Sequence, residues 1–450
     1  MEIKQFEDKN LSHYAYAILS NGEMALIDPA RNPQPYYDFA QQHHAKITTV
    51  IETHPHADFV SGHLEISKTT GATIYVSKLL GADYPHKTFD EGDTITLGNI
   101  SLKAFNTPGH SPDSICILAI DENGKAEALF SGDTLFIGDC GRPDLRESAG
   151  AITAAREELA KNMYHSLRDK LIGLPNDVRV FPAHGAGSLC GRGMSDQNTS
   201  TMGAEKISNW SLQEMTEAEF VDALLEGQPF VPKYFGFDVM LNKKGADNFS
   251  ESINAVKKHD AIINANSANV LDENIPIIDT RPEKIFKKAY LKNAINLMKG
   301  GAFETWLGSI MNPGEAFYLA AENENDMNEL IARSAKIGYE KQIEMAFVLN
   351  YGNNEMPLFD DELLKTHANE YTIIDVRNEK EMKEGKIFAN ALEIPLPELR
   401  ERTNEIPIDK PIVVHCAAGY RSAAGSSIIK AALNGTIQVY DLGEAVNKFK

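Results

Sequence analysis

Six side chains that could bind a transition metal each follow a short apolar run. They are His54, His56, Asp58, His110, Asp133 and His184. Turns rich in glycine and proline surround them and restrict the backbone at these positions. Neutral imidazole and carboxylate groups are ligands for zinc, iron and manganese. The sequence therefore predicts a metal site at a place where several strands end.

A cysteine near the end of the chain indicates a second kind of chemistry. Cys416 follows the apolar, β-branched run 411–415 and opens a short loop that leads into a helical run at 423–433. Backbone N–H groups of such a loop, with the positive end of the helix dipole, stabilise a thiolate. Arg421 lies in the same loop. The pattern predicts a nucleophilic sulfur in a loop that also holds anions.

These side chains need strands that end close together. Strands are expected at 47–53, 95–106, 114–120, 128–130 and 178–182, and a helix at 151–171. The second half contains a near-repeat, because Asp279 and Arg281 recur as Asp375 and Arg377, 96 residues later. Each copy has the pattern strand, helix, strand, helix, which is typical of a parallel sheet. Domains are expected at 1–242, 262–350 and 358–450.

The predicted metal ligands lie in four segments, around His54, His110, Asp133 and His184. These segments, in their order and spacing, resemble the metallo-β-lactamase superfamily. The resemblance implies an α/β multidomain protein that begins with an αββα sandwich and carries its metal site on one edge. Hydrolases of the superfamily, such as glyoxalase II, hold two zinc ions with the motif H-x-H-x-D-H. Here the residue after Asp58 is Phe59, which cannot bind a metal. A second site would keep little more than Asp58 and His184.

The persulfide dioxygenase branch of the superfamily is more similar. It implies one Fe(II) per chain, bound by His54, His110 and Asp133. Two imidazoles and one carboxylate leave open positions for a persulfide and O₂. On this interpretation His56, Asp58 and His184 form an outer pocket or a vacant second metal site. A zinc-dependent thioester hydrolase of the glyoxalase II kind is the alternative.

Two further residues are expected to border the metal site. Arg142 belongs to a Gly-Arg-Pro-Asp segment at 141–144 that resembles one closing the site in the dioxygenase branch. It could bind a substrate carboxylate or form a structural ion pair. Cys190 follows His184 in a glycine-rich loop, and its thiol could form a mixed disulfide with the substrate.

The loop from Cys416 to Ser422, Cys-Ala-Ala-Gly-Tyr-Arg-Ser, resembles the active loop of a rhodanese, a sulfurtransferase. The resemblance implies that Cys416 carries a sulfane sulfur and that Arg421 closes the loop and holds anions. In the first copy the corresponding strand runs into Ala-Ala-Glu-Asn at 320–323, without a cysteine. That copy is expected to be a catalytically inactive rhodanese-like domain.

Taken together, the chain resembles fusions of a persulfide dioxygenase with an inactive and an active rhodanese domain. The resemblance implies oxidation of a low-molecular-weight thiol persulfide by O₂ to sulfite, followed by sulfur transfer through Cys416 to give thiosulfate. Coenzyme A, bacillithiol and glutathione persulfides are all open as substrates. A non-enzymatic persulfide relay is a third interpretation. Assembly as a homodimer or homotetramer is expected by analogy.

Composition excludes several other classes of function. The chain of 450 residues has 44 basic and 64 acidic side chains and a net charge of −20. So acidic a surface repels phosphate backbones, so no nucleic-acid partner is expected. No apolar run reaches the roughly 18 residues that a membrane span needs. The four cysteines are too few for a disulfide framework, and a cytoplasmic location is expected.

Overall fold

Two six-stranded sheets form the N-terminal part of the protein. We describe a computed structural model, which covers residues 1–143, 145, 156–259, 262–264 and 270–450. The first sheet consists, in order, of β1 (Glu2–Asp8), β2 (His13–Ser20), β3 (Glu23–Ile27), β4 (Lys46–Ile51), β5 (Thr73–Val76) and β6 (Lys87–Thr88). The second consists of β12 (Ser200–Thr201), β11 (Arg179–Pro182), β10 (Ala126–Gly132), β9 (Ile115–Ile120), β8 (Ile100–Asn106) and β7 (Thr94–Leu97).

Both sheets are mixed. In the first, β1 to β3 are antiparallel and β3 to β6 are parallel. In the second, β10 and β11 are parallel, whereas the other neighbouring strands are antiparallel. Parallel strands that share an edge bring their carboxyl ends together, and this is where the predicted metal ligands follow the strands.

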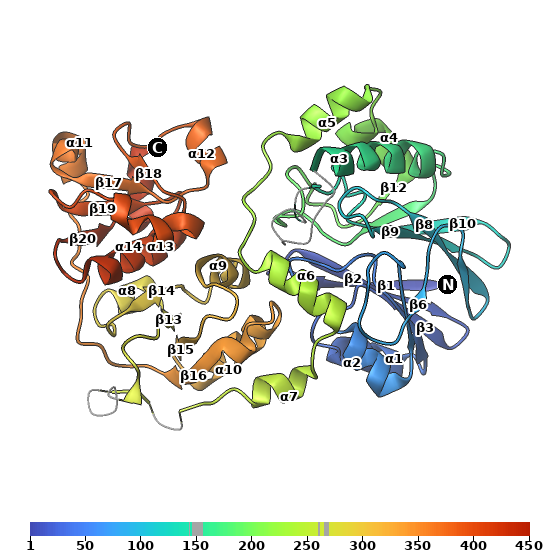
Figure 1. Ribbon diagram of the computed structural model, residues 1–450, viewed down its shortest axis with the longest axis horizontal. Helices are drawn as coiled ribbons and strands as arrows, with labels where there is room; N and C mark the ends of the chain where they lie inside the picture. The colour runs from blue at the N-terminus through green and yellow to red at the C-terminus, as the bar shows by residue number, and fades with distance from the viewer. Residues whose placement is uncertain (144, 146–155, 260–261, 265–269) are drawn as a thin grey trace. The chain divides into compact units, whose positions relative to one another are not determined.

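The helices of this part are α1 (Gln34–Gln42), α2 (His63–Thr70), α3 (Arg156–His165), α4 (Met202–Ser208), α5 (Glu217–Leu225), α6 (Phe235–Lys244) and α7 (Phe249–Asn254). A core of aromatic and aliphatic side chains from both sheets, including Tyr16 and Phe130, separates the sheets. Residues of α1 and α2 pack on the first sheet, and residues of α3 and α5 pack on the second (Figure 1). The expected αββα sandwich is therefore confirmed.

Two smaller sheets follow, and every pairing within them is parallel. The first has the order β14 (Ala294–Asn296), β13 (Ile277–Asp279), β15 (Phe317–Ala321), β16 (Ile343–Val348). The second has the order β18 (Leu392–Glu393), β17 (Thr372–Asp375), β19 (Ile412–His415), β20 (Val439–Asp441). The identical strand order confirms two rhodanese-like α/β copies with parallel sheets.

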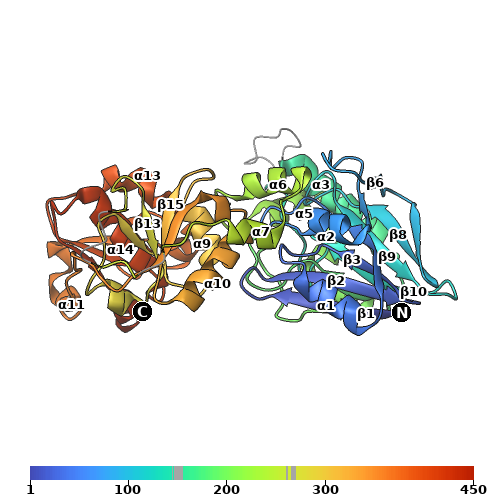
Figure 2. The same ribbon diagram turned by 90° about the horizontal axis from the view of Figure 1, so that it is seen from below.

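The helices of these copies are α8 (Glu283–Phe286), α9 (Phe303–Ile310), α10 (Glu324–Ala335), α11 (Leu363–His367), α12 (Glu379–Glu384), α13 (Leu399–Arg402) and α14 (Tyr420–Leu433). Helix α14 packs on β19 of its own copy and also on β14 of the first copy (Figure 1). Seen from below, α14 lies next to β13 of the first copy (Figure 2). The Ser427 hydroxyl accepts a hydrogen bond from the backbone N–H of Asn296 at 2.9 Å. One helix therefore serves both copies.

The same ion pair holds the first strand of each copy. Arg281 donates from Nε and Nη2 to the carboxylate of Asp279, and Arg377 does the same to Asp375. In each copy the Arg Nη2 also donates to a carbonyl oxygen eight residues later. A buried bidentate pair of this kind fixes the backbone that follows the strand.

One expectation from the sequence needs correction, and another lies only partly within the described residues. The single strand expected at 95–106 is wrong, because Gly98, at φ +55°, turns the chain between β7 and β8. The helix expected at 151–171 begins outside the described residues. Its described part is α3, and a π-helical segment at Ser166–Leu171 follows it.

The chain divides into two compact units, Met1–Glu251 with Lys336–Gly338 and Ser252–Ala335 with Tyr339–Lys450. The second unit holds both rhodanese-like copies. The finer boundaries at 1–242, 262–350 and 358–450 stay predictions. Among the described helices, none is long and apolar enough to cross a membrane.

Candidate functional site

The six predicted metal ligands come together at the carboxyl ends of strands from both sheets. The loop after β4 carries His54, His56 and Asp58, and the loops after β8, β10 and β11 carry one ligand each. All six side chains are buried. They form two neighbouring groups, His54 with His110 and Asp133, and His56 with Asp58 and His184.

In the first group, one ligand atom from each of His54, His110 and Asp133 lies within 4.8 Å of the others. Asp133 Oδ2 lies 3.4 Å from His110 Nε2 and 3.7 Å from His54 Nε2. It accepts no hydrogen bond from any described residue. A buried carboxylate oxygen that faces two imidazole nitrogens in this way fits a bound cation.

The orientation of the His54 ring is set by a hydrogen bond of its Nδ1, on the side of the ring away from Asp133. Its Nδ1 lies 3.0 Å from Thr53 Oγ1, and the Thr53 hydroxyl donates to Asp28 Oδ2 at 2.8 Å. Because the hydroxyl proton is directed to Asp28, Thr53 Oγ1 accepts from His54 Nδ1–H. The lone pair of His54 then lies on Nε2, which faces Asp133.

In the second group, His184 connects two carboxylates. Its Nε2 lies 2.8 Å from Asp58 Oδ2, and its Nδ1 lies 2.7 Å from Asp133 Oδ1. Burial by itself would lower the pKa of His184, but the charges of Asp133 and Asp58 hold it well above its ordinary value. Burial would likewise raise the pKa of Asp133, but His184 and His110 hold it well below.

Phe59 occupies the position after Asp58. Its side chain is 1% exposed, and its ring centroid lies 3.8 Å from that of His13 and 4.3 Å from that of His56. The ring therefore fills the space beside the second group with carbon. The second group has three potential ligands and no fourth from this position.

Two glycines allow the loops to approach closely. A Cβ at Gly132, where φ is +51°, would lie 2.7 Å from Thr53 Oγ1. A Cβ at Gly141 would lie 2.0 Å from the carbonyl oxygen of Asp133 and 2.9 Å from His110 Nδ1. A larger residue at Gly132 would displace Thr53, which orients His54, and one at Gly141 would displace the ligands Asp133 or His110.

The structure places Cys190 beside both groups of metal ligands, because it neighbours Asp133 of the first and His184 of the second. Its thiol, with Asp133 and His184, forms a third group whose atoms lie within 4.8 Å of one another. Burial, with the charges of Asp58 and Asp133, raises the pKa of the Cys190 thiol well above its ordinary value. A mixed disulfide with substrate stays a prediction.

Arg142 is held by backbone groups. Its Nη1 donates to the carbonyl oxygens of Leu189 at 3.3 Å and Phe230 at 3.5 Å, and its N–H donates to that of Cys190 at 2.9 Å. It is 1% exposed. These contacts attach the 141–143 segment to the Cys190 loop. Asp144, the last residue of that motif, lies outside the described residues.

Cys416 lies where β19 ends, 1% exposed. The N–H of Gly419 donates to Cys416 Sγ at 3.1 Å, and Gly419 has a φ of +103°, which favours glycine. Arg421 forms a bidentate pair with Glu381 on α12, at 2.5 and 2.8 Å. The loop thus offers an N–H donor to the sulfur beside a fixed guanidinium.

The first copy has a different loop at the same place. After β15 the chain passes through Glu322 and Asn323 into α10, and the Asn323 side chain accepts from the N–H of Asp326. Asp326 in turn pairs with Lys299 at 2.6 Å. The first turn of α10 carries Glu324 and Asp326, whereas the first turn of α14 in the second copy carries no acidic residue, so the first copy is less suited to hold an anion there.

Comparison with known proteins agrees with this division. Residues 9–184 match the metallo-beta-lactamase superfamily, and residues 360–450 match the rhodanese-like domain. A solved metallo-beta-lactamase from Staphylococcus aureus subsp. aureus COL is 31% identical, with a TM-score of 0.67. The match covers 77% of this chain and 98% of that one. The chain belongs to the metallo-beta-lactamase superfamily.

Two curated relatives share only the metallo-beta-lactamase part. Cytoplasmic hydroxyacylglutathione hydrolase of Arabidopsis thaliana is 32% identical over 176 residues, covering 38% of this chain and 63% of that protein. Mitochondrial persulfide dioxygenase ETHE1 of Homo sapiens is 30% identical over 164 residues, covering 36% of this chain and 59% of that protein. The chain spans less than two thirds of either relative.

The protein is therefore a metallo-beta-lactamase domain, related to persulfide dioxygenases and hydroxyacylglutathione hydrolases, with a C-terminal rhodanese domain. Its buried clusters of His and Asp are typical of the metal sites of the metallo-beta-lactamase superfamily. The roles of the individual ligands stay predictions.

Three residues of the metallo-beta-lactamase domain hold the site without having been predicted from the sequence. Asp28 accepts from the N–H and hydroxyl of Thr53 and lies 3.2 Å from His56 Nε2. It directly follows β3, so its place after an apolar run is a signal that could have found it. The Asn242 amide donates to the carbonyl oxygens of His56 and Phe59. His13 opens β2, and its ring centroid lies 5.6 Å from that of His184.

Neither His13 nor Asn242 carries a signal in the sequence, since each acts across a long stretch of chain. Burial, with the charges of His184 and His56, holds the pKa of His13 well below its ordinary value. His13 is therefore a neutral ring against Phe59. Asn242 lies on α6, near the end of the first expected domain.

Proposed function

We propose that the protein is an Fe(II)-dependent persulfide dioxygenase joined to a rhodanese-type sulfurtransferase. The observation that carries this proposal is Phe59, buried against His13 and His56 at the position where a two-metal hydrolase would place a ligand. It leaves His54, His110 and Asp133 as the complete ligand set for one metal. The likeness to persulfide dioxygenase ETHE1 supports the same activity.

Two imidazoles and a carboxylate would hold the metal with three positions open. Bound Fe(II) would supply the redox chemistry by which O₂ oxidises the outer sulfur of the persulfide. The protein's own groups keep this geometry: Thr53 orients His54, and His184 holds Asp133 through Oδ1, which leaves Oδ2 for the metal. The overall reaction converts R-S-SH, O₂ and water into R-SH, sulfite and two protons.

Sulfur transfer belongs to Cys416. Its thiolate attacks the outer sulfur of a second persulfide, R-S-SH, and the S–S bond of that persulfide breaks. The proton of the outer sulfur passes to the departing R-S⁻, which leaves as R-SH. Sulfite then attacks the sulfur carried on Cys416, and thiosulfate leaves as the thiolate re-forms. The Gly419 N–H, 3.1 Å from Cys416 Sγ, stabilises the negative sulfur at both stages. Arg421 would attract sulfite and thiosulfate.

The substrate is a low-molecular-weight thiol persulfide of the coenzyme A, bacillithiol or glutathione type. Sulfite and thiosulfate are the other small molecules of the reaction.

The proposed function is tested by metal content and oxygen uptake, measured on protein purified without air. We expect one iron per chain and rapid O₂ consumption with at least one of the three persulfides. Stoichiometric zinc, with no O₂ consumption, would overturn the proposed dioxygenase activity.

A zinc-dependent thioester hydrolase joined to a sulfurtransferase is the second candidate. The observation that favours it is the second group, in which His56, Asp58 and His184 lie within 4.8 Å of one another. The likeness to hydroxyacylglutathione hydrolase points the same way. Two zinc ions per chain and release of a free thiol from an acylated glutathione would establish this activity.

A further inference from the structure

The active loop reaches out of its own copy at Tyr420. This residue follows Gly419, whose N–H donates to Cys416 Sγ, and it begins α14. The Tyr420 hydroxyl donates to the carbonyl oxygen of Met298 in the first copy at 2.8 Å. Its ring also lies beside Gly301, where a Cβ would come within 3.4 Å of the ring. The residue next to the sulfur-binding donor is therefore fixed by the other copy.

The first copy holds the receiving loop rigidly. Arg333 on α10 donates to the carbonyl oxygen of Lys299 at 2.6 Å and to that of Gly301 at 3.4 Å. It also forms a bidentate pair with Glu304, at 2.8 and 2.6 Å, and both side chains are buried. A desolvated pair with further hydrogen bonds keeps one geometry, so the Met298 carbonyl is a fixed acceptor.

A second contact involves the guanidinium of Arg421. Its carbon lies 5.8 Å from the centroid of the Trp306 ring, which belongs to α9 of the first copy. On its own copy Arg421 is bonded to Glu381. The anion-binding side chain therefore contacts a carboxylate of the active copy and an aromatic ring of the inactive one.

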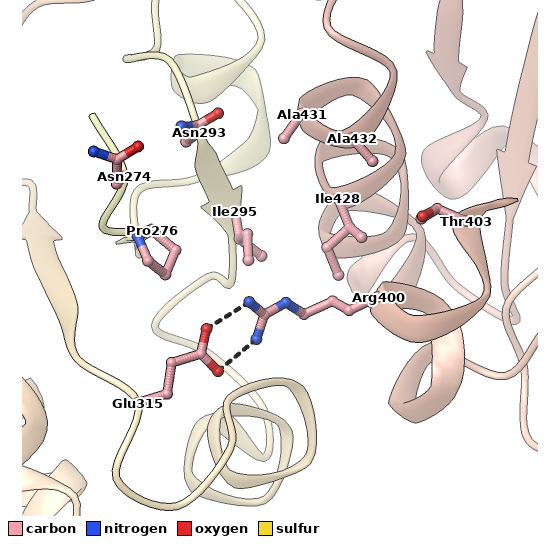
Figure 3. Close-up of a pocket in the computed structure, with 10 residues that line it drawn as sticks. All are labelled: Asn274, Pro276, Asn293, Ile295, Glu315, Arg400, Thr403, Ile428, Ala431 and Ala432. Atoms are coloured by element: carbon pink, nitrogen blue, oxygen red, sulfur yellow. Dashed lines mark hydrogen bonds and ion pairs between the residues drawn. The ribbon is translucent and has the colours of Figure 1, made fainter.

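The far end of α9 is fastened to the active copy as well. Arg400 on α13 donates to the carbonyl oxygen of Ile310 at 2.9 Å and forms a bidentate pair with Glu315, at 2.9 and 2.6 Å. Figure 3 shows this pair at the edge of a cavity of about 240 Å³, with Ile295 and Ile428 facing each other from the two copies. Trp306 thus lies on a helix that the active copy holds at its end.

We propose that the first rhodanese-like copy positions the Cys416 loop, with Tyr420 and Trp306 as positioning residues that act through Gly419 and Arg421. The proposal rests on the sulfur transfer proposed above. Loss of the Tyr420 contact loosens the peptide that directs an N–H at the sulfur, so the rate of transfer falls. Loss of the Trp306 contact frees Arg421, so anion binding weakens. The copy without a cysteine is in this way part of the active site's framework.

The first test changes the loop from the other copy. Gly301→Ala strains the loop that receives Tyr420, because φ is +63° there and its methyl would lie in ordinary contact with the Tyr420 ring, and Tyr420→Phe removes the hydrogen bond itself. For both we expect kcat for sulfur transfer from thiosulfate to cyanide to fall about three- to tenfold, with KM changed by less than about twofold. The control is Gly435→Ala, which also has positive φ, at +78°, but whose Cβ meets no described atom within 4 Å. It carries the same backbone strain and should keep the wild-type kcat.

The second test separates binding from rate. Trp306→Leu should raise KM for thiosulfate about threefold and leave kcat near the wild-type value, and Trp306→Phe should restore most of the loss. Tyr318→Phe is the matched control for Tyr420→Phe, because the Tyr318 hydroxyl also accepts a hydrogen bond from a backbone group, the N–H of Asp272, inside the first copy. It should change neither constant.

Amide hydrogen exchange of the 416–422 loop gives a readout that needs no catalysis. We expect faster exchange in Gly301→Ala than in Gly435→Ala. A wild-type protein that transfers no sulfur would overturn the proposed function but leave this comparison intact. The positioning role is overturned if Gly301→Ala and Tyr420→Phe both keep wild-type kcat and loop exchange. It is also overturned if Tyr318→Phe lowers kcat as much as Tyr420→Phe.

Discussion

The two reactive centres of this chain are assembled on different scales. His54, His110 and Asp133 come from loops after β4, β8 and β10, which belong to two different sheets. The groups around Cys416 come mainly from the run of seven residues at 416–422, which begins after β19 and ends in the first turn of α14. The metal-type site therefore depends on how the two sheets of the sandwich pack, whereas the reactive sulfur and its N–H donor belong to one strand–helix junction, which the first copy contacts from outside. Four changes would break or sharpen this contrast.

Cys416→Ser should have the largest effect, and only on the local site. A serine hydroxyl is not ionised at neutral pH, so sulfur transfer from thiosulfate should fall about a thousandfold or more. Oxygen uptake with a persulfide should stay near the wild-type rate, and the product should change from thiosulfate to sulfite. Ion chromatography distinguishes the two products. Continued enzymatic formation of thiosulfate would mean that Cys416 is not the carrier.

His110→Ala makes the reverse cut. Removal of one of three ligands should lower oxygen uptake about a hundredfold or more, together with the metal bound per chain. Sulfur transfer should be unchanged, since Cys416 belongs to the other unit. The control is His165→Ala at the exposed end of α3, where the imidazole contacts Asp169 and Glu217. Loss of both activities in His110→Ala would show that the two centres are not separable.

Phe59→His tests whether one side chain limits the metal count. An imidazole in place of the Phe59 ring, whose centroid lies 6.4 Å from that of His184, would give the second group a fourth ligand. We expect the metal content after zinc loading to rise from one to two per chain, read by elemental analysis. Phe59→Leu should stay at one. A count of two in the unaltered protein would remove the reason for a single-metal site.

Glu381→Gln should have the smallest effect, because it keeps the shape of the Cys416 loop and weakens only the support of Arg421. We expect KM for thiosulfate to rise about threefold, with kcat little changed. Burial by itself would raise the pKa of Glu381, but hydrogen bonds from Arg421 hold it below its ordinary value of 4.5. The pair is therefore intact at neutral pH and is lost as the pH falls below that value.

Wild-type KM should accordingly rise as the pH falls through the acid range, whereas the Glu381→Gln variant should show no such step. Far-UV circular dichroism at each pH verifies that the protein remains folded. An identical pH profile in the two proteins would show that Glu381 does not support Arg421.

The sequence predicts both sites for the same physical reason. A ligand that directly follows a buried strand, such as Asp133 after β10, is tied to the strand's end, so its position is readable from a local pattern. The near-repeat is readable in the same way, because Asp279 and Asp375 close matching strands. The turn at Gly98 does have a signal in the sequence, because Gly98-Asn99 is a two-residue hairpin pair between alternating runs, and the expectation of one strand at 95–106 overlooked it.

Contacts that span long stretches of chain were not predictable. Asn242 supports the loop of His56 from a helix that lies 186 residues away in sequence. Tyr420 reaches Met298 across 122 residues. Neither residue type is unusual for its local setting, so no pattern in a single sequence distinguishes it from an ordinary surface side chain.

Helix α14 couples the solubility of the first copy to the presence of the second. β14 is the outermost strand of its sheet, and Ser427 of α14 caps the N–H of Asn296 on it. Without that cover, an open strand edge would be free to pair with other chains and aggregate. A protein without the second copy would expose the edge strand β14, and a protein without the first copy would expose the face of α14 that packs on β14. The two copies should therefore be soluble together and prone to aggregate when separated, whatever chemistry each performs.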